Sequence, residues 1–490
     1  MSLEVAAVPS QARNQRRDNE HHPNRLLVAA LLALLTWGAL AFGAEYSWAY
    51  APVVVFAAAT GLLGLRTSTG AAFPSRYVLV ALFTIVLAAV VQLIPVRATD
   101  GVLEGSSSSV NYEGLRARVA IEPAPHLRIS QAVSIASDRT SLGLAFLVSL
   151  SILLLGTVRA FSAVGLRATV RGVAALGLAV AFVGIIQAAV RGEALYGFWI
   201  PPKGGTSFAP FLNENHFAGW MVMAMSLAMG RLAGGLATGM RQVAAGVRSR
   251  VLWFASPPGT EMLLTAFAVA VMALSMVITR SRGGLIGLAM TATLSSAWVI
   301  RRQSSSSRRL VHVSLILLIL LMAVARGGVE GTLAQFEGSS LDWGGRRQIW
   351  QDTSRIIQDH PWTGTGLNTF GIAMLHYQSG PKNELVIEAH NDYLQLAAEG
   401  GLLLGIPILI TIALFIREVW CRFKEGADDE RTYWLRAGAV TGLCSIAVME
   451  AFDFTLQMPG AAVLFVVLAA IAIHRPDYLA RRREARAVRE

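Results

Sequence analysis

Long apolar runs recur along most of this chain and are separated by short polar segments. The runs hold 16 to 20 residues, about the length that an α-helix needs to cross a hydrocarbon core of about 30 Å. Twelve runs can be assigned, at 26–43, 48–65, 77–95, 140–158, 172–190, 214–230, 261–279, 283–300, 310–325, 397–416, 433–451 and 459–474. The pattern predicts an all-α polytopic membrane protein with about twelve transmembrane helices.

The composition and the charge distribution support this class. Apolar residues make up 54% of the chain and charged residues only 15%, whereas about a quarter of the residues in a soluble domain are charged. If the N-terminus lies in the cytoplasm, 28 of the 42 Lys and Arg residues fall on the cytoplasmic side. Both termini are then cytoplasmic. The net charge of +11 reflects this topology and contact with anionic lipids, and gives little support to nucleic-acid binding.

The spans divide the chain into three predicted regions. Residues 1–25 form a basic cytoplasmic tail that is expected to be disordered, 26–474 form the transmembrane domain, and 475–490 form a second basic tail. The segments expected on the outer face are 96–139, 191–213 and 327–396. The last is the longest, and it separates the ninth and tenth spans.

The pattern of apolar residues, prolines and glycines predicts secondary structure within this long outer loop. Apolar residues at helical spacing predict an amphipathic helix from Arg346 to Asp359, which ends at His360-Pro361 because a residue before proline leaves the α region. Gly364, Gly366 and Asn368 then predict a turn. A helix is expected to resume near residue 391 and to carry Asp392, Gln395 and Glu399 on one face.

The segment Thr279–Gly284 is the first candidate for binding chemistry. Arg280 and Arg282 stand at the outer face, against the trend of the basic residues, and Gly283 and Gly284 open the next helix with accessible N–H groups. A helix N-terminus flanked by guanidinium groups suits phosphate or pyrophosphate. The alternative is that both arginines extend to lipid head groups.

Two further candidates lie in the long loop. Arg346 and Arg347 begin its amphipathic helix, either as anion ligands or as solvated charges beside the interfacial Trp350. His390 and Asn391 precede the tenth span. A histidine can take a proton from a hydroxyl near neutral pH, although a loop histidine with a backbone partner is the simpler interpretation.

Other polar groups are expected at the same face. Asn213, Asn215 and His216 begin the sixth span, where they either bind a sugar or pyrophosphate or cap the helix. Glu450 and Asp453 end the eleventh span, where a carboxylate either orients an arginine or histidine or is simply interfacial. Metal-binding and nucleotide-binding motifs are absent from the sequence. This combination suits a lipid-linked pyrophosphate whose departure is assisted by arginines, with no metal ion and no cofactor.

Four sequence blocks, in this order and spacing, resemble the bacterial O-antigen ligase superfamily. They are N-x-N-H-F-A at 213–218, SRGG at 281–284, GRRQIW at 345–350 with HPWTGTGLNTF at 360–370, and AHNDYLQLAAEGG at 389–401. The superfamily includes O-antigen ligases, Wzy-type polysaccharide polymerases and protein O-oligosaccharyltransferases. The resemblance covers about residues 200–460.

The resemblance implies a GT-C-like, metal-independent, inverting glycosyltransferase of the bacterial inner membrane. Its donor would be a glycan on undecaprenyl pyrophosphate, and its acceptor a hydroxyl of lipid A-core or of a growing polysaccharide. Arg280 and Arg282 would hold the pyrophosphate, and Arg346 would add to this. His390 would be the general base or would orient the acceptor. Supporting polar groups would be Asn213, Asn215, His216, Arg347 and Asn391.

One departure from the family pattern affects the type of enzyme. Ligases often continue from the histidine motif as G-x-x-G-T-x-G, whereas here Gly401 is followed by Leu404, Gly405 and Ile406. This favours a capsule or exopolysaccharide polymerase, but leaves both types open.

Two other functional classes compete with the enzyme. A transporter or flippase of lipid-linked sugars would place ionisable residues in the middle of broken spans, whereas the charges here collect at the outer ends. A non-catalytic protein of polysaccharide assembly gives no reason for the outer arginines.

Overall fold

The chain is mostly helical in the part that the computed structural model describes. The described residues are 10–66, 75–95, 133–164, 166–190, 194–201, 207–240, 243, 246–279, 281–302, 340–380 and 385–476. Within them, the only extended pairings are isolated bridges, Leu195 with Trp199 and Phe208 with Phe211. The predicted all-α polytopic class is confirmed.

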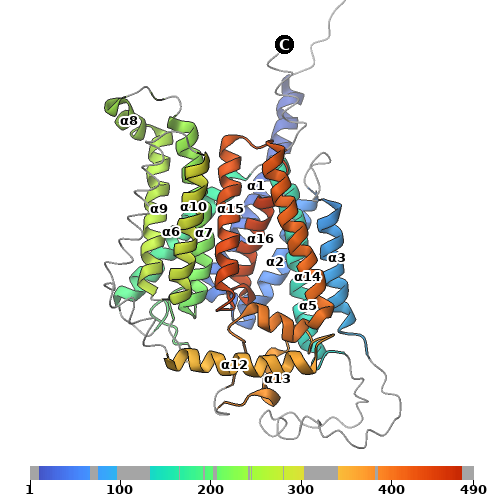
Figure 1. The fold of residues 1–490 in the computed structure, drawn as a ribbon. Coiled ribbons are helices and arrows are strands. Elements are labelled where there is room, and N and C mark those ends of the chain that lie inside the picture. The colour runs from blue at the N-terminus through green and yellow to red at the C-terminus, as the bar shows by residue number, and fades with distance from the viewer. Residues whose placement is uncertain are drawn as a thin grey trace, which may run out of the picture. The chain divides into compact units, whose positions relative to one another are not determined.

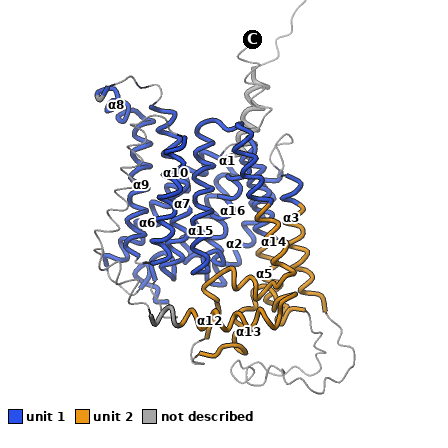
Figure 2. The backbone as a smooth tube through the Cα atoms, in the orientation of Figure 1, with its two compact units in different colours: residues 1–79, 148–338, 414–490 blue, residues 80–147, 339–413 orange. Residues whose placement is uncertain are grey.

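The chain divides into two compact units, which Figure 2 distinguishes by colour. Unit 1 comprises 1–79, 148–338 and 414–490, and unit 2 comprises 80–147 and 339–413. Three of the four boundaries fall within helices, namely α3 (Arg76–Val91), α5 (Ser137–Val164) and α14 (Asp392–Glu425).

Unit 1 is a helical bundle with α7 at its centre (Figure 1). The elements that lie wholly in unit 1 are α1 (Ser10–Leu40), η1 (Phe42–Ala44), α2 (Ser47–Arg66), α6 (Arg167–Val190), α7 (Glu214–Gly239), α8 (Val247–Phe254), α9 (Pro257–Thr279), α10 (Arg282–Arg302), α15 (Glu430–Met449), η3 (Thr455–Gln457) and α16 (Pro459–Ile473). Helices α6, α9, α10, α15 and α16 all pack on α7, which is buried along nearly its whole length. Glycines allow α15 to approach α7 closely. A Cβ at Gly438 of α15 would lie 2.7 Å from the carbonyl oxygen of Ser226 of α7.

Unit 2 contains parts of α3, α5 and α14 together with α12 (Ser340–Asp359) and α13 (Phe370–Tyr377). Ile356 of α12 packs with Phe370 and Met374 of α13 and with Ala389 and Ala398. A second apolar cluster joins Leu404 of α14 to Ile85, Ala88 and Ala89 of α3.

The structure has a helix at eleven of the twelve predicted spans, and the twelfth, 310–325, lies outside the described residues. Seven of the described helices are long and apolar enough to cross a membrane, namely 47–66, 137–162, 167–190, 214–239, 257–279, 282–302 and 392–425. The apolar helices at 25–40, 76–91 and 459–473 are shorter. Helix α15 occupies the predicted span 433–451 but is not among the seven.

One expectation about the N-terminal tail is wrong. Helix α1 begins at Ser10, so residues 10–25 are helical and not disordered. The tail contains Gln, Arg and Glu, which favour helix, and these residues extend the helix that the first apolar run begins. Residues 1–9 and 477–490 lie outside the described part of the chain.

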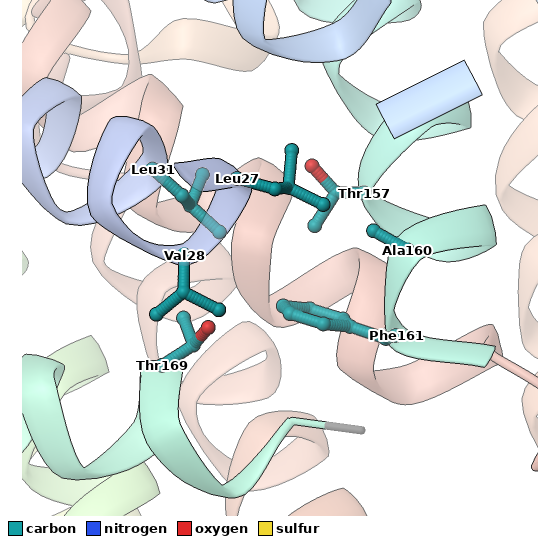
Figure 3. Close-up of a pocket in the computed structure, with 7 residues that line it drawn as sticks. All are labelled: Leu27, Val28, Leu31, Thr157, Ala160, Phe161 and Thr169. Atoms are coloured by element: carbon teal, nitrogen blue, oxygen red, sulfur yellow. The ribbon is translucent and has the colours of Figure 1, made fainter. Parts of the chain in front are cut away.

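A small pocket in unit 1 lies between α1, α5 and α6 (Figure 3). Its lining consists of five apolar side chains and the hydroxyls of Thr157 and Thr169. The pocket contains no charged group, and it is therefore unsuited to binding a phosphate.

Candidate functional site

Unit 1 carries its predicted polar residues at one end of the bundle. The N-terminal ends of α7 and α10 lie there with the C-terminal end of α15, because α15 runs antiparallel to both of these helices (Figure 1). Three segments that are far apart in the sequence, 213–216, 281–284 and 450–455, therefore meet. This region is called the α7/α10 end below.

Hydrogen bonds join the two helix starts at the α7/α10 end. The Asn213 side chain caps α7 by accepting from the Asn215 N–H at 2.7 Å. The Ser281 hydroxyl donates to Asn215 Oδ1 at 2.5 Å and accepts from the Gly284 N–H at 2.9 Å. Asn213 thus acts as a helix cap, one of the two roles expected for it, and Asn215 connects α7 to the cap of α10.

The two glycines of the SRGG segment have different surroundings. A Cβ on Gly284 would lie 2.7 Å from Cβ of Ala218, so Gly284 allows α10 to pack closely on α7. A Cβ on Gly283 would approach no atom more closely than 3.9 Å. Of the two, Gly283 is therefore the one that leaves its backbone open to a ligand. Arg282 is half-buried at the first position of α10, and Arg280 lies outside the described residues.

Buried polar groups lie behind this surface. The His216 side chain is only 2% exposed and packs edge-on against Phe454, with ring centroids 4.6 Å apart. Glu450 and Asp453 are 1% and 2% exposed, and the Thr455 hydroxyl donates to Asp453 at 3.4 Å. A ligand at the surface can therefore reach Asn215 and Arg282 more easily than it can reach His216. The buried His216 side chain packs beneath the start of α7.

Unit 2 fixes the backbone on both sides of His390. The Trp350 indole N–H donates to the carbonyl of Ala389 at 2.9 Å, and the N–H of Ala389 donates to Gln395 Oε1 at 2.9 Å. On the other side, Asn391 Oδ1 accepts from the Leu394 N–H at 3.0 Å and caps α14. His390 itself has a φ of 51°, an uncommon conformation for a residue other than glycine.

Gln395 and Glu399, two of the three residues of the stripe predicted on α14, form a buried hydrogen-bond network, whereas Asp392 is half-buried. The Glu399 carboxylate accepts from the N–H groups of Asn368 at 2.8 Å and Phe370 at 3.0 Å, and Gln395 donates to it at 3.4 Å. Gln395 therefore links the Glu399 carboxylate to Ala389, next to His390. The network joins α13, α14 and the loop before α14 within unit 2.

A break in α14 provides the backbone around which the HPWTGTGLNTF segment folds. Gly401 has φ 52° and ψ −155°, which interrupts the helix. The N–H groups released there are satisfied because Leu402 donates to the carbonyl of Pro361 at 2.9 Å and Leu403 to that of Trp362 at 2.8 Å. The predicted turn is confirmed, since Gly364, Gly366 and Asn368 all have positive φ.

Gln92, in the turn directly after α3, also bonds the predicted turn and α14. Its buried side chain donates to the carbonyls of Thr363 and Glu399, both at 2.8 Å, and accepts from the Leu367 N–H at 3.1 Å. Sequence reasoning missed Gln92, although a lone amide within an apolar run was a usable signal. It also gave no role to Ser281 or to the Trp350 N–H, because the partner of each is distant in the sequence.

The predicted amphipathic helix is present as α12, which ends at Asp359 directly before His360-Pro361. Arg346 is half-buried and Arg347 is exposed near its N-terminal part. At its other end, the Tyr377 hydroxyl donates to Asp359 at 2.7 Å. Partial burial and this carboxylate raise the pKa of Tyr377 to about 12, so the phenol stays protonated at neutral pH.

Comparison with known protein families gives a match for part of the chain. Residues 267–409 match the family model described as O-antigen ligase. The matched residues include Arg282, Arg346, Arg347, His390 and Asn391, whereas Asn213, Asn215 and His216 precede them. No curated protein matches the chain significantly.

Proposed function

Because residues 267–409 match the O-antigen ligase family model, we propose that this multi-pass membrane protein transfers a glycan from undecaprenyl pyrophosphate to an acceptor hydroxyl. The acceptor is lipid A-core or a growing polysaccharide, on the periplasmic side of the bacterial inner membrane. The observation that carries the proposal is that the matched residues contain both Arg282 at a helix start and His390 on a fixed backbone. These residues supply the two functions that such a transfer requires.

The pyrophosphate leaving group is assigned to the α7/α10 end. When the bond between the anomeric carbon and the pyrophosphate oxygen breaks, negative charge grows on that oxygen. The Arg282 guanidinium and the open backbone at Gly283 supply positive charge at a helix N-terminus, and Arg280 adjoins them in the sequence. Charge stabilisation of this kind lowers the barrier without a metal ion.

The acceptor is assigned to His390. Its imidazole takes the hydroxyl proton while the acceptor oxygen attacks the anomeric carbon on the face opposite the leaving pyrophosphate, which inverts the configuration. The hydrogen bonds at Ala389 and Asn391 support this role, because they limit the movement of the backbone on both sides. Arg346 and Asn391 are assigned to binding the donor and acceptor, with Arg347, Asn213, Asn215 and His216 in supporting positions.

Single substitutions test the two roles. We expect His390→Ala and Arg282→Ala each to reduce surface-glycan production at least about 100-fold, as loss of a general base or of charge stabilisation does. The matched controls are His376→Ala and Arg301→Ala, which remove an exposed histidine from unit 2 and an exposed arginine from the far end of α10. Wild-type glycan output in either test variant, at normal protein level in the membrane, would contradict the assignment.

Deletion of the gene separates the two enzyme types. Loss of a ligase leaves full-length glycan on the lipid carrier, whereas loss of a polymerase leaves single repeat units. Leu404 favours the polymerase, since the ligase pattern has glycine there. Analysis of the lipid-linked glycans in the deletion strain decides between them, and an unchanged glycan profile would contradict both.

A further inference from the structure

Unit 1 has a second charged region, a pocket at the end of α7 that is remote from Asn215. It is lined by residues of α6, α7, α8, α9 and α15 and has an empty volume of about 600 Å³ including its open mouth. From Asn215 to Gly235 helix α7 rises about 30 Å, so this pocket is separate from the α7/α10 end. It is called the basic pocket below.

Four arginines line the basic pocket, namely Arg167, Arg171, Arg231 and Arg431, together with one carboxylate, Glu261. Glu261 accepts from Arg171 at 3.1 Å and from Arg231 at 2.8 Å, and Arg167 pairs with the neighbouring Asp429 at 2.6 Å. Four positive charges thus face two negative ones. The pocket keeps a net charge of about +2 and attracts an anion.

The arginines keep N–H donors available because two hydroxyls and two carboxylates, Glu261 and Asp429, accept from only a few of them. Arg431 uses Nε to donate to the Thr238 hydroxyl at 2.9 Å, and Arg231 uses Nε for the Thr265 hydroxyl at 3.2 Å. A guanidinium has five N–H donors in a planar fork that matches phosphate oxygens. These bonds fix the direction of two arginines from outside the pocket through Nε alone, and of the terminal nitrogens Arg231 gives only Nη2 to Glu261.

The remaining lining combines small and apolar residues. Gly234, Gly235 and Gly239 of α7 have no side chains to fill the space, and Trp253 of α8 forms part of the wall. On the same short helix, Val251 and Leu252 are both 61% exposed, and Arg248 and Arg250 are exposed as well. Exposed apolar and basic residues on one helix are typical of an element that lies at a membrane surface.

We propose that the basic pocket binds a phosphate group, with the head group of an anionic phospholipid as its main source. Charge and arginine geometry suit a phosphate diester, and the apolar surface of α8 suits the adjoining acyl chains. On the topology that the Lys and Arg distribution predicts, this end faces the cytoplasmic leaflet, which is rich in anionic lipid. The proposal does not depend on the glycosyltransferase function.

Lipid-dependent thermal unfolding tests the proposal. The full-length protein in neutral detergent is titrated with phosphatidylglycerol, with phosphatidylcholine as the reference, and with inorganic phosphate in a separate arm. We expect phosphatidylglycerol to raise Tm, and Arg171→Gln with Arg431→Gln to raise its apparent Kd at least about 10-fold. Both side chains lie at the surface, so their replacement leaves the fold intact.

The matched control removes Arg248 and Arg250 of α8, which carry the same charge but do not line the pocket. We expect Arg248→Gln with Arg250→Gln to change the Kd less than about twofold, and Arg171→Lys with Arg431→Lys to retain part of the affinity. Stabilisation by inorganic phosphate that the Gln pair abolishes would identify a soluble phosphate as a source and would also support the site. Equal losses in the test and control pairs, or no stabilisation by either probe, would overturn it.

Discussion

At the scale of single residues, hydrogen bonds to the neighbouring residues fix the backbone conformation of His390. Its φ of 51° is unfavourable for a residue with a Cβ, and such conformations persist only where the surroundings fix them. The surroundings here are Trp350, Gln395 and Asn391, whose side chains bond the backbone at 389 and 394. These three side chains therefore hold the backbone that carries the imidazole in one conformation.

We expect Trp350→Phe to reduce glycan transfer about 3- to 10-fold, because it removes one hydrogen bond worth about 1 kcal/mol while keeping an aromatic ring on α12. Trp362→Phe is the control, since that side chain is 72% exposed. Transfer is measured as surface glycan at equal amounts of protein in the membrane. Equal effects of the two substitutions would show that the bond to Ala389 does not matter for the reaction.

At the scale of elements, the break in α14 explains two glycine-rich motifs together. A Cβ on Gly401 would lie 2.5 Å from the N–H nitrogen of Gly364, and both residues have positive φ. The AAEGG and TGTG segments therefore need glycine because two backbones touch. Their shared purpose in unit 2 is to hold the turn before α13 against α14.

We expect Gly401→Ala to destabilise the protein by about 2 kcal/mol or more, since alanine is strained at this φ and its Cβ meets backbone. Gly405→Ala is the matched control on the same helix, because a Cβ there has nothing within 4 Å. Thermal unfolding of the purified protein measures both. A Gly401→Ala protein as stable as the Gly405→Ala protein would be inconsistent with the interlocked backbones.

We expect Ser281→Ala to cost about 1 kcal/mol, because it removes the cap of α10 and the bond to Asn215. Ser296→Ala, on the same helix, removes only a local bond to the carbonyl of Ala292 and should change stability by less than about 0.5 kcal/mol. Thermal unfolding again compares the pair. Equal losses of stability in the two variants would show that the cap of α10 contributes no more than a local hydrogen bond within the helix.

At the scale of the whole molecule, this is an all-α, multi-pass membrane protein whose residues 267–409 match the O-antigen ligase family model. Its unit 1 has polar chemistry at both ends of α7, namely amides and Arg282 at one end and the basic pocket at the other. The topology predicted from basic residues assigns these ends to opposite faces of the membrane. The proposed transfer and the proposed lipid site would then act on different leaflets.

Reporter fusions test that topology. We expect alkaline phosphatase to be inactive when it is fused after Glu490 and active when it is inserted within 96–139, since the enzyme requires the periplasm. The reason is the excess of Lys and Arg on the side that carries both termini. Activity after Glu490 would reverse the orientation and move the proposed transfer to the cytoplasmic side.

Much of the local structure could be predicted from the sequence. The apolar runs located the helices, because a helix in lipid must satisfy its own backbone and expose apolar side chains. His360-Pro361 set the end of α12, and the glycines of 364–366 set the turn, because both effects act within a few residues. The α10 start at the SRGG segment follows the same local rules.

Contacts between distant segments were decided only by the tertiary structure. The sequence by itself determined that Ser281, Asn215 and Gln92 were polar, but not that Ser281 bonds Asn215 or that Gln92 bonds the turn before α13. The sequence also suggested that His216 and Gly284 bind a ligand. In the structure both are buried, and Gly284 packs against Ala218 of α7. Local propensity acts between near neighbours, whereas burial and hydrogen-bond pairing depend on which helices pack together, and that packing exists only in the folded chain.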